Sequence, residues 1–144
     1  MSDRITFTVP LPPKAIRSNS RYFWAAKVKA KQAYSAAVWS SAASAGVWGY
    51  VSPFNIHGVP WQRARVTFTW RAAGVLPDQA NIAGNCKALL DIICCAPNTG
   101  KLTVNRTTYL GLIENDRNVE LVCRVEKVAH RSDEAVVVEI ERLG

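Results

Sequence analysis

The sequence predicts one domain of the α/β or α+β class, in which a mixed β-sheet is packed by two helices in the order β-α-β-α-β-β-β. Its 144 residues are a usual length for one domain, since most folds need roughly 100–200 residues. Hydrophobic residues make up 49% of the chain and charged residues 20%, which allows an ordinary buried core. Segments of alternating and of helical hydrophobic spacing follow one another. Residues 1–144 are therefore expected to form a single unit.

The first half of the chain predicts a strand, a long helix and a loop. Residues 4–9 alternate in polarity, so they predict a strand whose odd-numbered side chains face inward. The prolines that follow end this strand, because proline has no N–H to donate to a sheet. An alanine-rich segment from about Trp24 to Val47 has helical spacing, and Gly46 marks its end. Residues 48–62 contain several glycines and prolines and predict a loop.

The second half predicts one more helix and the remaining strands. Hydrophobic residues alternate with arginines and threonines over residues 63–70, so this strand is expected to have one polar, basic face. After a loop, residues 80–95 predict the second helix. Residues 96–108 predict a further loop or hairpin, and three strands are expected at 109–113, 119–128 and 134–142.

The charge of the chain is strongly positive. It has 18 Lys and Arg against 11 Asp and Glu, a net charge of +7. Basic residues dominate residues 1–78, where Asp3 and Asp78 are the only acids. This asymmetry favours a polyanionic partner over a merely soluble basic surface. The basic residues concerned are Arg4, Lys14, Arg17, Arg21, Lys27, Lys29, Lys31, Arg63, Arg65 and Arg71.

Targeting signals and cysteine usage both favour the cytoplasm. No apolar run reaches the roughly 18 residues that a membrane span needs, and the first residues lack the apolar core of a signal peptide. The four cysteines form no CxxC pair, so we interpret them as small buried hydrophobic residues and not as zinc ligands.

The segment at residues 78–91 carries the strongest functional pattern. At 100° per residue its apolar side chains fall on one arc of about 100° that must face the core. The polar side presents an amide, a lysine and a carboxylate together on an arc of about 120°. The expected core residues are Ile82, Cys86, Leu89, Leu90 and Ile93, and the opposite arc holds Asn81, Gly84, Lys87 and Asp91.

These polar groups suit phosphodiester hydrolysis, although a structural role is open at this point. Carboxylates hold Mg²⁺ or Mn²⁺, and a lysine stabilises the anion that develops on a phosphate. Alternatively, Asp78 is a helix-capping acid and Lys87 with Asp91 is a surface pair, although the lysine-first order makes it a weak one. A second acidic stretch, Glu114 to Asp116, follows the strand expected at 109–113 and is placed to complete a metal site.

Taken together, these segments resemble the RusA family of Holliday junction resolvases over nearly the whole chain. The family opens with a strand, a proline-rich turn and an Asn-x-Arg-Tyr element, which here read Val9-Pro-Leu-Pro-Pro13 and Asn19-Ser-Arg21-Tyr22. Its core pattern is Asp-x-Asp-Asn, then Lys-x-x-x-Asp in a helix, and later Asp-Asp after a strand. The matching residues are Asp78-Gln-Ala-Asn81, Lys87-Ala-Leu-Leu-Asp91 and Ile113-Glu-Asn-Asp116.

The resemblance implies a dimeric, Mg²⁺-dependent (or Mn²⁺-dependent) endonuclease that nicks four-way DNA junctions in DNA recombination and repair, in a bacterial or phage-infected cell. It implies a catalytic set of Asp78, Lys87, Asp91 and Asp116, in which the three acids bind the metal. Together with the basic pattern, it predicts DNA contacts from Lys14, Arg17, Asn19, Arg21, Arg63, Arg65, Asn81 and Lys87.

Two positions depart from the family pattern. Ala80 replaces an acid of the family's catalytic set, and Asn115 replaces the first acid of the later pair. We therefore expect weakened or absent cleavage, with DNA binding retained. The alternative function is a catalytically silent DNA-binding protein on the same scaffold.

Two further expectations concern assembly and electrostatics. The five tryptophans and the alanine-rich helix offer more apolar surface than a small domain needs, which predicts a homodimer. Converging carboxylates repel one another, so we expect one acid of the site to have a raised pKa.

Overall fold

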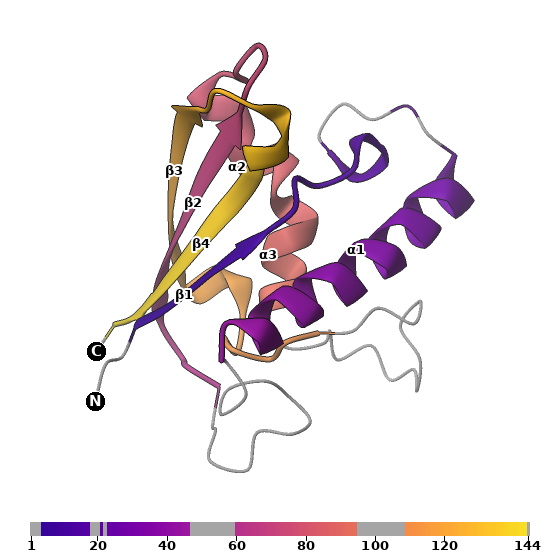
Figure 1. The fold of residues 1–144 in the computed structure, drawn as a ribbon. Coiled ribbons are helices and arrows are strands. Elements are labelled where there is room, and N and C mark those ends of the chain that lie inside the picture. Colours follow the sequence, from indigo (N-terminus) through magenta and orange to yellow (C-terminus); the bar gives the residue numbers. More distant parts are fainter. Residues whose placement is uncertain (1–3, 18–20, 22, 47–59, 95–108, 144) are drawn as a thin grey trace.

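Four strands form one mixed sheet in the order β1-β4-β2-β3 (Figure 1). The computed structural model describes residues 4–17, 21, 23–46, 60–94 and 109–143. Strand β4 is antiparallel to both of its neighbours, and β3 is parallel to β2. The strands are β1 (Arg4–Val9), β2 (Ala64–Ala72), β3 (Val119–Lys127) and β4 (Ala135–Arg142).

The helices lie on one side of this sheet (Figure 1). The long α1 (Trp24–Ser44) packs on β1 and on α3 (Lys87–Ile93), whereas α2 (Gln79–Asn85) packs on β3. Three single-turn 3₁₀ helices complete the described elements: η1 (Lys14–Ile16), η3 (Asp116–Asn118) and η4 (Arg131–Asp133). A mixed sheet with helices on one face is the α+β single domain that the sequence predicts.

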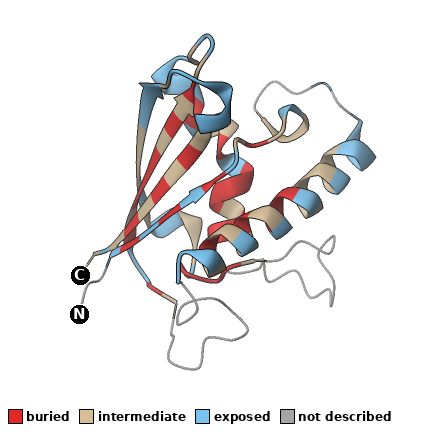
Figure 2. Ribbon diagram, viewed as in Figure 1, coloured by how far each residue is buried: buried red, intermediate tan, exposed pale blue. Residues whose placement is uncertain are grey.

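The core fills the space between the sheet and the helices (Figure 2). Alternation in β1 and β4 turns every second side chain inward, as expected for a sheet with one covered face. Burial of this apolar surface is the main stabilising contribution to the fold, at about 25 cal/mol per Å². The five core residues predicted around α2 and α3, Ile82, Cys86, Leu89, Leu90 and Ile93, are all buried.

The predicted second helix is interrupted and forms two short helices. Cys86, with φ −104° and ψ 12°, lies between α2 and α3. The residues before it, Gly84 and Asn85, are poor helix formers. The break makes Lys87 the first residue of α3.

The strand predicted at 109–113 is wrong. Gly111 has a φ of 67°, which a regular strand does not accommodate. Leu110, Leu112 and Ile113 are all buried, so the segment lacks the alternation of a half-covered strand. It forms only isolated bridges, from Ile113 to Trp61 and to Cys94.

Other predicted elements are close to those observed. The first helix ends at Ser44, with Gly46 at a φ of 81° just beyond it. The second strand extends to Ala72. The loops predicted at 48–62 and 96–108 lie almost wholly outside the described residues. Among the helices that are described, none combines the length and the apolar character needed to cross a membrane.

Candidate active site

One lysine joins two carboxylates that come from different parts of the chain. The Nζ of Lys87 donates to Oδ1 of Asp91 at 2.9 Å and to Oδ2 of Asp116 at 2.8 Å. Lys87 and Asp91 lie one turn apart on α3, whereas Asp116 opens η3. The prediction that Lys87, Asp91 and Asp116 lie together is therefore confirmed for these three residues.

A backbone contact with α3 brings Asp116 to this position. The N–H of Leu110 donates to the carbonyl of Ile92 at 2.8 Å, and that of Leu112 donates to Ile93 at 3.0 Å. Leu112 in turn accepts from the N–H of Trp61 at 2.9 Å. The segment before η3 is thus fixed on the end of α3, and the acidic turn that follows it reaches Lys87.

Asn115 shapes the turn that presents Asp116. Its side chain accepts from the N–H of Arg117 at 2.9 Å, which is the role of a helix N-cap. Asparagine and aspartate serve this role equally well. Asn115 therefore keeps a capping function at a position where the RusA pattern has an acid.

The shared proton donor explains the electrostatics of the cluster. The hydrogen bonds that Lys87 donates to Asp116 and Asp91 raise the pKa of its ammonium above the usual range. The hydrogen bond from Lys87 is also the main cause that lowers the pKa of Asp116. The expectation of a raised pKa is wrong for Asp116, because an ammonium group separates the two carboxylates.

Two further residues surround Asp91. Lys31 of α1 places its Nζ 3.8 Å from Oδ2 of Asp91. Partial burial, together with the nearby charge of Asp91, raises the pKa of Tyr109. Asp91 thus lies between two lysines and close to a phenol.

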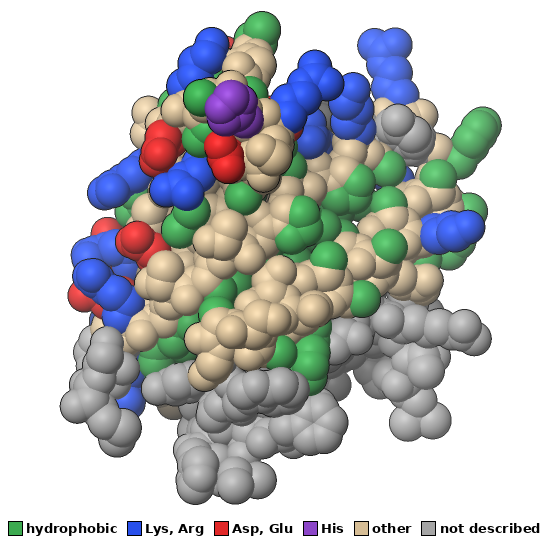
Figure 3. Space-filling model, viewed as in Figure 1, with side chains coloured by type: hydrophobic (Ala, Val, Ile, Leu, Met, Phe, Trp, Pro, Cys, Tyr) green, Lys and Arg blue, Asp and Glu red, His purple; other side chains and the backbone are tan. Residues whose placement is uncertain are grey.

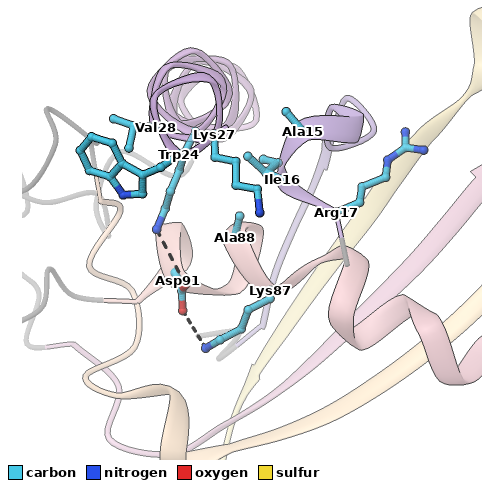
Figure 4. A pocket seen from close by; sticks show the side chains of 10 residues that line it. Ala15, Ile16, Arg17, Trp24, Lys27, Val28, Lys87, Ala88 and Asp91 are labelled. Atoms are coloured by element: carbon cyan, nitrogen blue, oxygen red, sulfur yellow. Dashed lines mark hydrogen bonds and ion pairs between the residues drawn. The ribbon is translucent and has the colours of Figure 1, made fainter. Parts of the chain in front are cut away.

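A cavity of about 260 Å³ opens beside Asp91 and Lys87, between η1, α1 and α3 (Figure 4). Figure 4 shows Lys27 extending from α1 towards Ala88, with Trp24 at the side of Asp91. Four of the residues that line the cavity are basic and one is acidic. The lining consists of Ala15, Ile16, Arg17, Trp24, Lys27, Val28, Lys31, Lys87, Ala88 and Asp91.

The contribution of α1 to this site was missed in the sequence. Trp24, Lys27, Val28 and Lys31 lie three, four and seven residues apart, which places them along one helical face. The alanine-rich composition of this helix was interpreted as apolar surface for a homodimer instead. A charged stripe next to an aromatic residue at the helix start was the available signal.

Asp78 does not complete a group of three acids. It is exposed at the N-cap of α2, where its carbonyl accepts from the N–H of Asn81 and its side chain makes no capping hydrogen bond. In the described part of the chain, no three side chains of His, Cys, Asp or Glu lie close enough to hold a metal ion. The expected convergence of Asp78, Asp91 and Asp116 is therefore not observed. Asn81 and Ala80 are exposed on the same short helix.

Asp91 and Asp116 suit a weakly held Mg²⁺. Magnesium is usually bound by one or two carboxylates and keeps several waters or substrate oxygens as its other ligands. Both carboxylates face the point that the Lys87 ammonium occupies. A shift of that flexible, half-exposed side chain would leave both acids directed at a common position.

The residues predicted to contact DNA lie in different parts of the structure. Lys14 of η1 and Arg21 are exposed, while Arg17 donates to the carbonyl of Pro12 at 2.7 Å and lies 5.0 Å from the centre of the Trp70 ring. Arg63 is exposed just before β2. Asn19 lies outside the described residues.

Arg65 belongs to a different environment from the one predicted. Its guanidinium pairs with Glu120 at 3.3 Å and with Glu141 at 3.7 Å on neighbouring strands. The polar face of β2 is therefore balanced in charge and not simply basic. Figure 3 shows the same mixture of acidic and basic side chains over the strands at the left.

The cysteines and tryptophans also bear on the predictions. Cys86 and Cys94 are buried, as expected, and Cys123 is partly buried; none of the three forms a disulfide in the described part of the chain. Trp61 and Trp70 are buried and Trp39 packs against the same core, so the domain itself uses most of its described tryptophans. Of the four tryptophans that the structure describes, only Trp24 is largely exposed. The apolar surplus that predicted a homodimer is smaller than the sequence indicated.

No protein-family model matches this chain, and no curated protein matches it.

Proposed function

We propose that this protein is a metal-dependent endonuclease that cleaves branched DNA, as the RusA-like motifs imply. The observation that carries this proposal is the contact of Lys87 with both Asp91 and Asp116. Lys87 and Asp116 are 29 positions apart in the sequence, and the RusA-like motifs include all three residues. A lysine beside two carboxylates can serve phosphate chemistry, in which the acids hold a metal ion and the ammonium binds the phosphate.

Each side chain has a distinct role in the proposed reaction. Asp91 and Asp116 would hold Mg²⁺ or Mn²⁺. The metal, when bound, supplies an activated water and neutralises charge on the phosphate. Lys87 would then turn from the carboxylates to a non-bridging phosphate oxygen, where its ammonium stabilises the anion that develops. The ammonium is protonated at neutral pH, as the side chain of an ordinary lysine is.

The replacement of an acid by Ala80 limits this activity. An aspartate at position 80 would add a carboxylate on exposed α2, two residues after Asp78. We therefore expect weak cleavage by this chain and stronger cleavage by Ala80→Asp. In this proposal Asp78 binds the metal only when α2 moves towards Asp91 and Asp116.

DNA recognition in this proposal depends on phosphates. The basic cavity supplies positive charge beside Asp91, and the exposed Lys14, Arg21 and Arg63 would add further phosphate contacts. Such contacts read shape more than sequence, and binding should fall steeply with salt because counterions are released. Paired nicking of a four-way junction requires two sites, which a twofold homodimer would provide.

The decisive test is cleavage of a labelled four-way junction in Mg²⁺ or Mn²⁺. We expect Ala80→Asp to increase the rate, and Asp116→Asn in that background to reduce it at least about hundredfold, because metal ligands matter more than their outer-shell partners. Asp133→Asn removes an exposed acid of η4 and is the matched control, with no change expected.

Several results would contradict the proposed nuclease function. Cleavage that persists in Asp116→Asn would overturn the proposed site. Absence of cleavage in both the unmodified chain and Ala80→Asp, with salt-dependent junction binding retained, would favour the second candidate. That candidate is a catalytically silent DNA-binding protein, and the failure of three acids to group in the described residues is the observation in its favour. Light scattering that gives a monomer would count against paired nicking.

A further inference from the structure

The cavity beside the acids combines an exposed indole with positive charge. Trp24 lines it and is 74% exposed. An indole offers a large flat apolar surface, and Trp61 and Trp70 by contrast are buried. The exposed ring of Trp24 is thus available to a ligand that enters the cavity.

The charge of the lining is suited to an anion. Lys27, Lys31 and Lys87 outnumber the single acid Asp91 in the lining, whereas the guanidinium of Arg17 lies over the Trp70 ring. Lys31 and Lys87 both pair with Asp91, so two basic residues share that one acid within the lining. Lys27 projects towards the interior of the cavity (Figure 4).

The apolar part of the lining lies next to these cations. Val28 of α1 and Ile16 of η1 lie beside Trp24 and Lys27 in the same cavity (Figure 4). A ligand that fits both parts needs a flat, weakly polar body and a negative group attached to it. A nucleotide has this chemistry, since its base stacks on aromatic rings while its phosphate binds lysines.

The size and form of the cavity indicate an unpaired nucleotide. About 260 Å³ is slightly below the range of pockets that take drug-sized ligands, roughly 300–1,000 Å³. A base inside a duplex is stacked on both sides and cannot reach an indole unless it leaves the stack. Unpaired bases are most readily available where a helix is interrupted.

We infer that this cavity binds one unpaired nucleotide of a DNA strand, with the base against Trp24 and the phosphate between Lys27 and Lys31. The inference rests on the proposed function in taking DNA as the ligand. It adds a source of selectivity to it, because base pairs at a branch point open more readily than those inside a continuous duplex. Asp91, shared by the cavity and the acid cluster, places the bound nucleotide next to the proposed cleavage site.

The chain contains matched controls for both components of the cavity. Phe23 is also aromatic and is 88% exposed, yet it is not part of the lining. Lys29 is exposed on α1 between Lys27 and Lys31 and is likewise not part of the lining. Phe23→Ala and Lys29→Ala therefore test whether any nearby aromatic or basic residue suffices.

The experiment uses a short single-stranded oligonucleotide with one 2-aminopurine, and the same strand in a full duplex, without divalent metal. Binding to the unmodified chain should quench the 2-aminopurine fluorescence of the single strand, because the base stacks on Trp24. Trp24→Phe should retain the quenching and Trp24→Ala should lose it. By anisotropy, Trp24→Ala should weaken single-strand binding about tenfold and duplex binding less than about twofold.

The possible outcomes separate this inference from the proposed function. Equal quenching by Trp24→Ala, or an equal loss with Phe23→Ala, would overturn the inference even if junctions are cleaved. Trp24-dependent quenching without any cleavage in Mg²⁺ would support the inference while the nuclease proposal fails. No DNA binding at low salt would overturn both. For the phosphate, Lys27→Ala should weaken single-strand binding more than Lys29→Ala, and equal effects would remove Lys27 from the site.

Discussion

Two charged regions of this protein differ in how they match acids with bases. On the open face of the sheet, Arg65 pairs with Glu120 and Glu141, which also pairs with Arg4, and Arg71 pairs with Glu126. These partners lie on neighbouring strands, where ion pairs are a common way to complete a solvated sheet surface. At the acid cluster, Lys87 joins two carboxylates that the fold brings from separate segments, beside a cavity.

The number of charges in a sequence therefore does not locate a binding surface. Arg65 and Lys27 contribute equally to the net charge, yet Arg65 faces acids on both sides and Lys27 lines a cavity with an excess of cations. We expect the ion pairs of the sheet face to stabilise the fold slightly and the residues of the cavity side to bind DNA. The following predictions test that contrast, beginning with the largest effect.

Removal of one acid from each region should separate them most clearly in a cleavage assay. In the Ala80→Asp background, Asp91→Asn should lower the rate of junction cleavage at least about hundredfold. Glu120→Gln, which removes an acid paired with Arg65 on the sheet, should leave the rate unchanged. Equal losses in the two variants would abolish the functional distinction between the regions.

Removal of one base from each region should affect DNA affinity unequally. Lys27→Ala should weaken junction binding and reduce the slope of log K against log salt by about one, as for a lost phosphate contact. Arg65→Ala should change both quantities little, because Glu120 and Glu141 already balance its charge. If Arg65→Ala weakens binding more than Lys27→Ala in salt-titrated anisotropy, DNA binds to the sheet face and not to the cavity.

Loss of the Asn115 cap should destabilise the turn that carries Asp116. Asn115→Ala should lower the free energy of unfolding by about 1 kcal/mol. Urea denaturation measures this change, and Asn115→Asp is the control, with stability expected to be retained. A cost in Asn115→Asp equal to that of alanine would show that the side chain does not act as a cap.

The titration of Asp116 should reveal its link to Lys87. The Lys87 hydrogen bond lowers the pKa of Asp116, so this contact stabilises the fold above the usual carboxyl range and is lost as the pH falls through the lowered pKa. Lys87→Met should raise the pKa of Asp116 in carboxyl ¹³C NMR. The effect on stability will be small because both side chains are well exposed to solvent. An unchanged pKa in Lys87→Met would disprove the contact.

The sequence was most informative where a periodic pattern was long. Alternation in β1 and β4 and the apolar arc around Cys86 predicted the buried faces correctly, since burial alone determines those patterns. It was misleading at 109–113, where a run of apolar residues resembles a strand but packs its backbone on the end of α3. Local propensity cannot distinguish these two forms of burial.

The candidate site was predicted in part. Spacing along one helix placed Lys87 beside Asp91, and the RusA resemblance added Asp116, which only the tertiary fold can bring near. The roles of Lys31 and Trp24 depend on how α1 crosses α3, and no pattern within either segment contains that information. The partners of Arg65 depend in the same way on strand register, which aligns it with Glu120 and Glu141.

The order of the strands has a consequence for how this protein meets other copies of itself. Among the described strands β3 pairs only with β2, so one of its sides offers backbone groups to any strand that approaches. One β3 carbonyl, that of Cys123, accepts from the side chain of Gln79. Such an edge invites sheet extension and aggregation unless charges interrupt it. Glu120, Arg124, Glu126 and Lys127 alternate in sign along β3 and are all exposed. A charged border of this kind disfavours pairing of β3 with a strand of another copy.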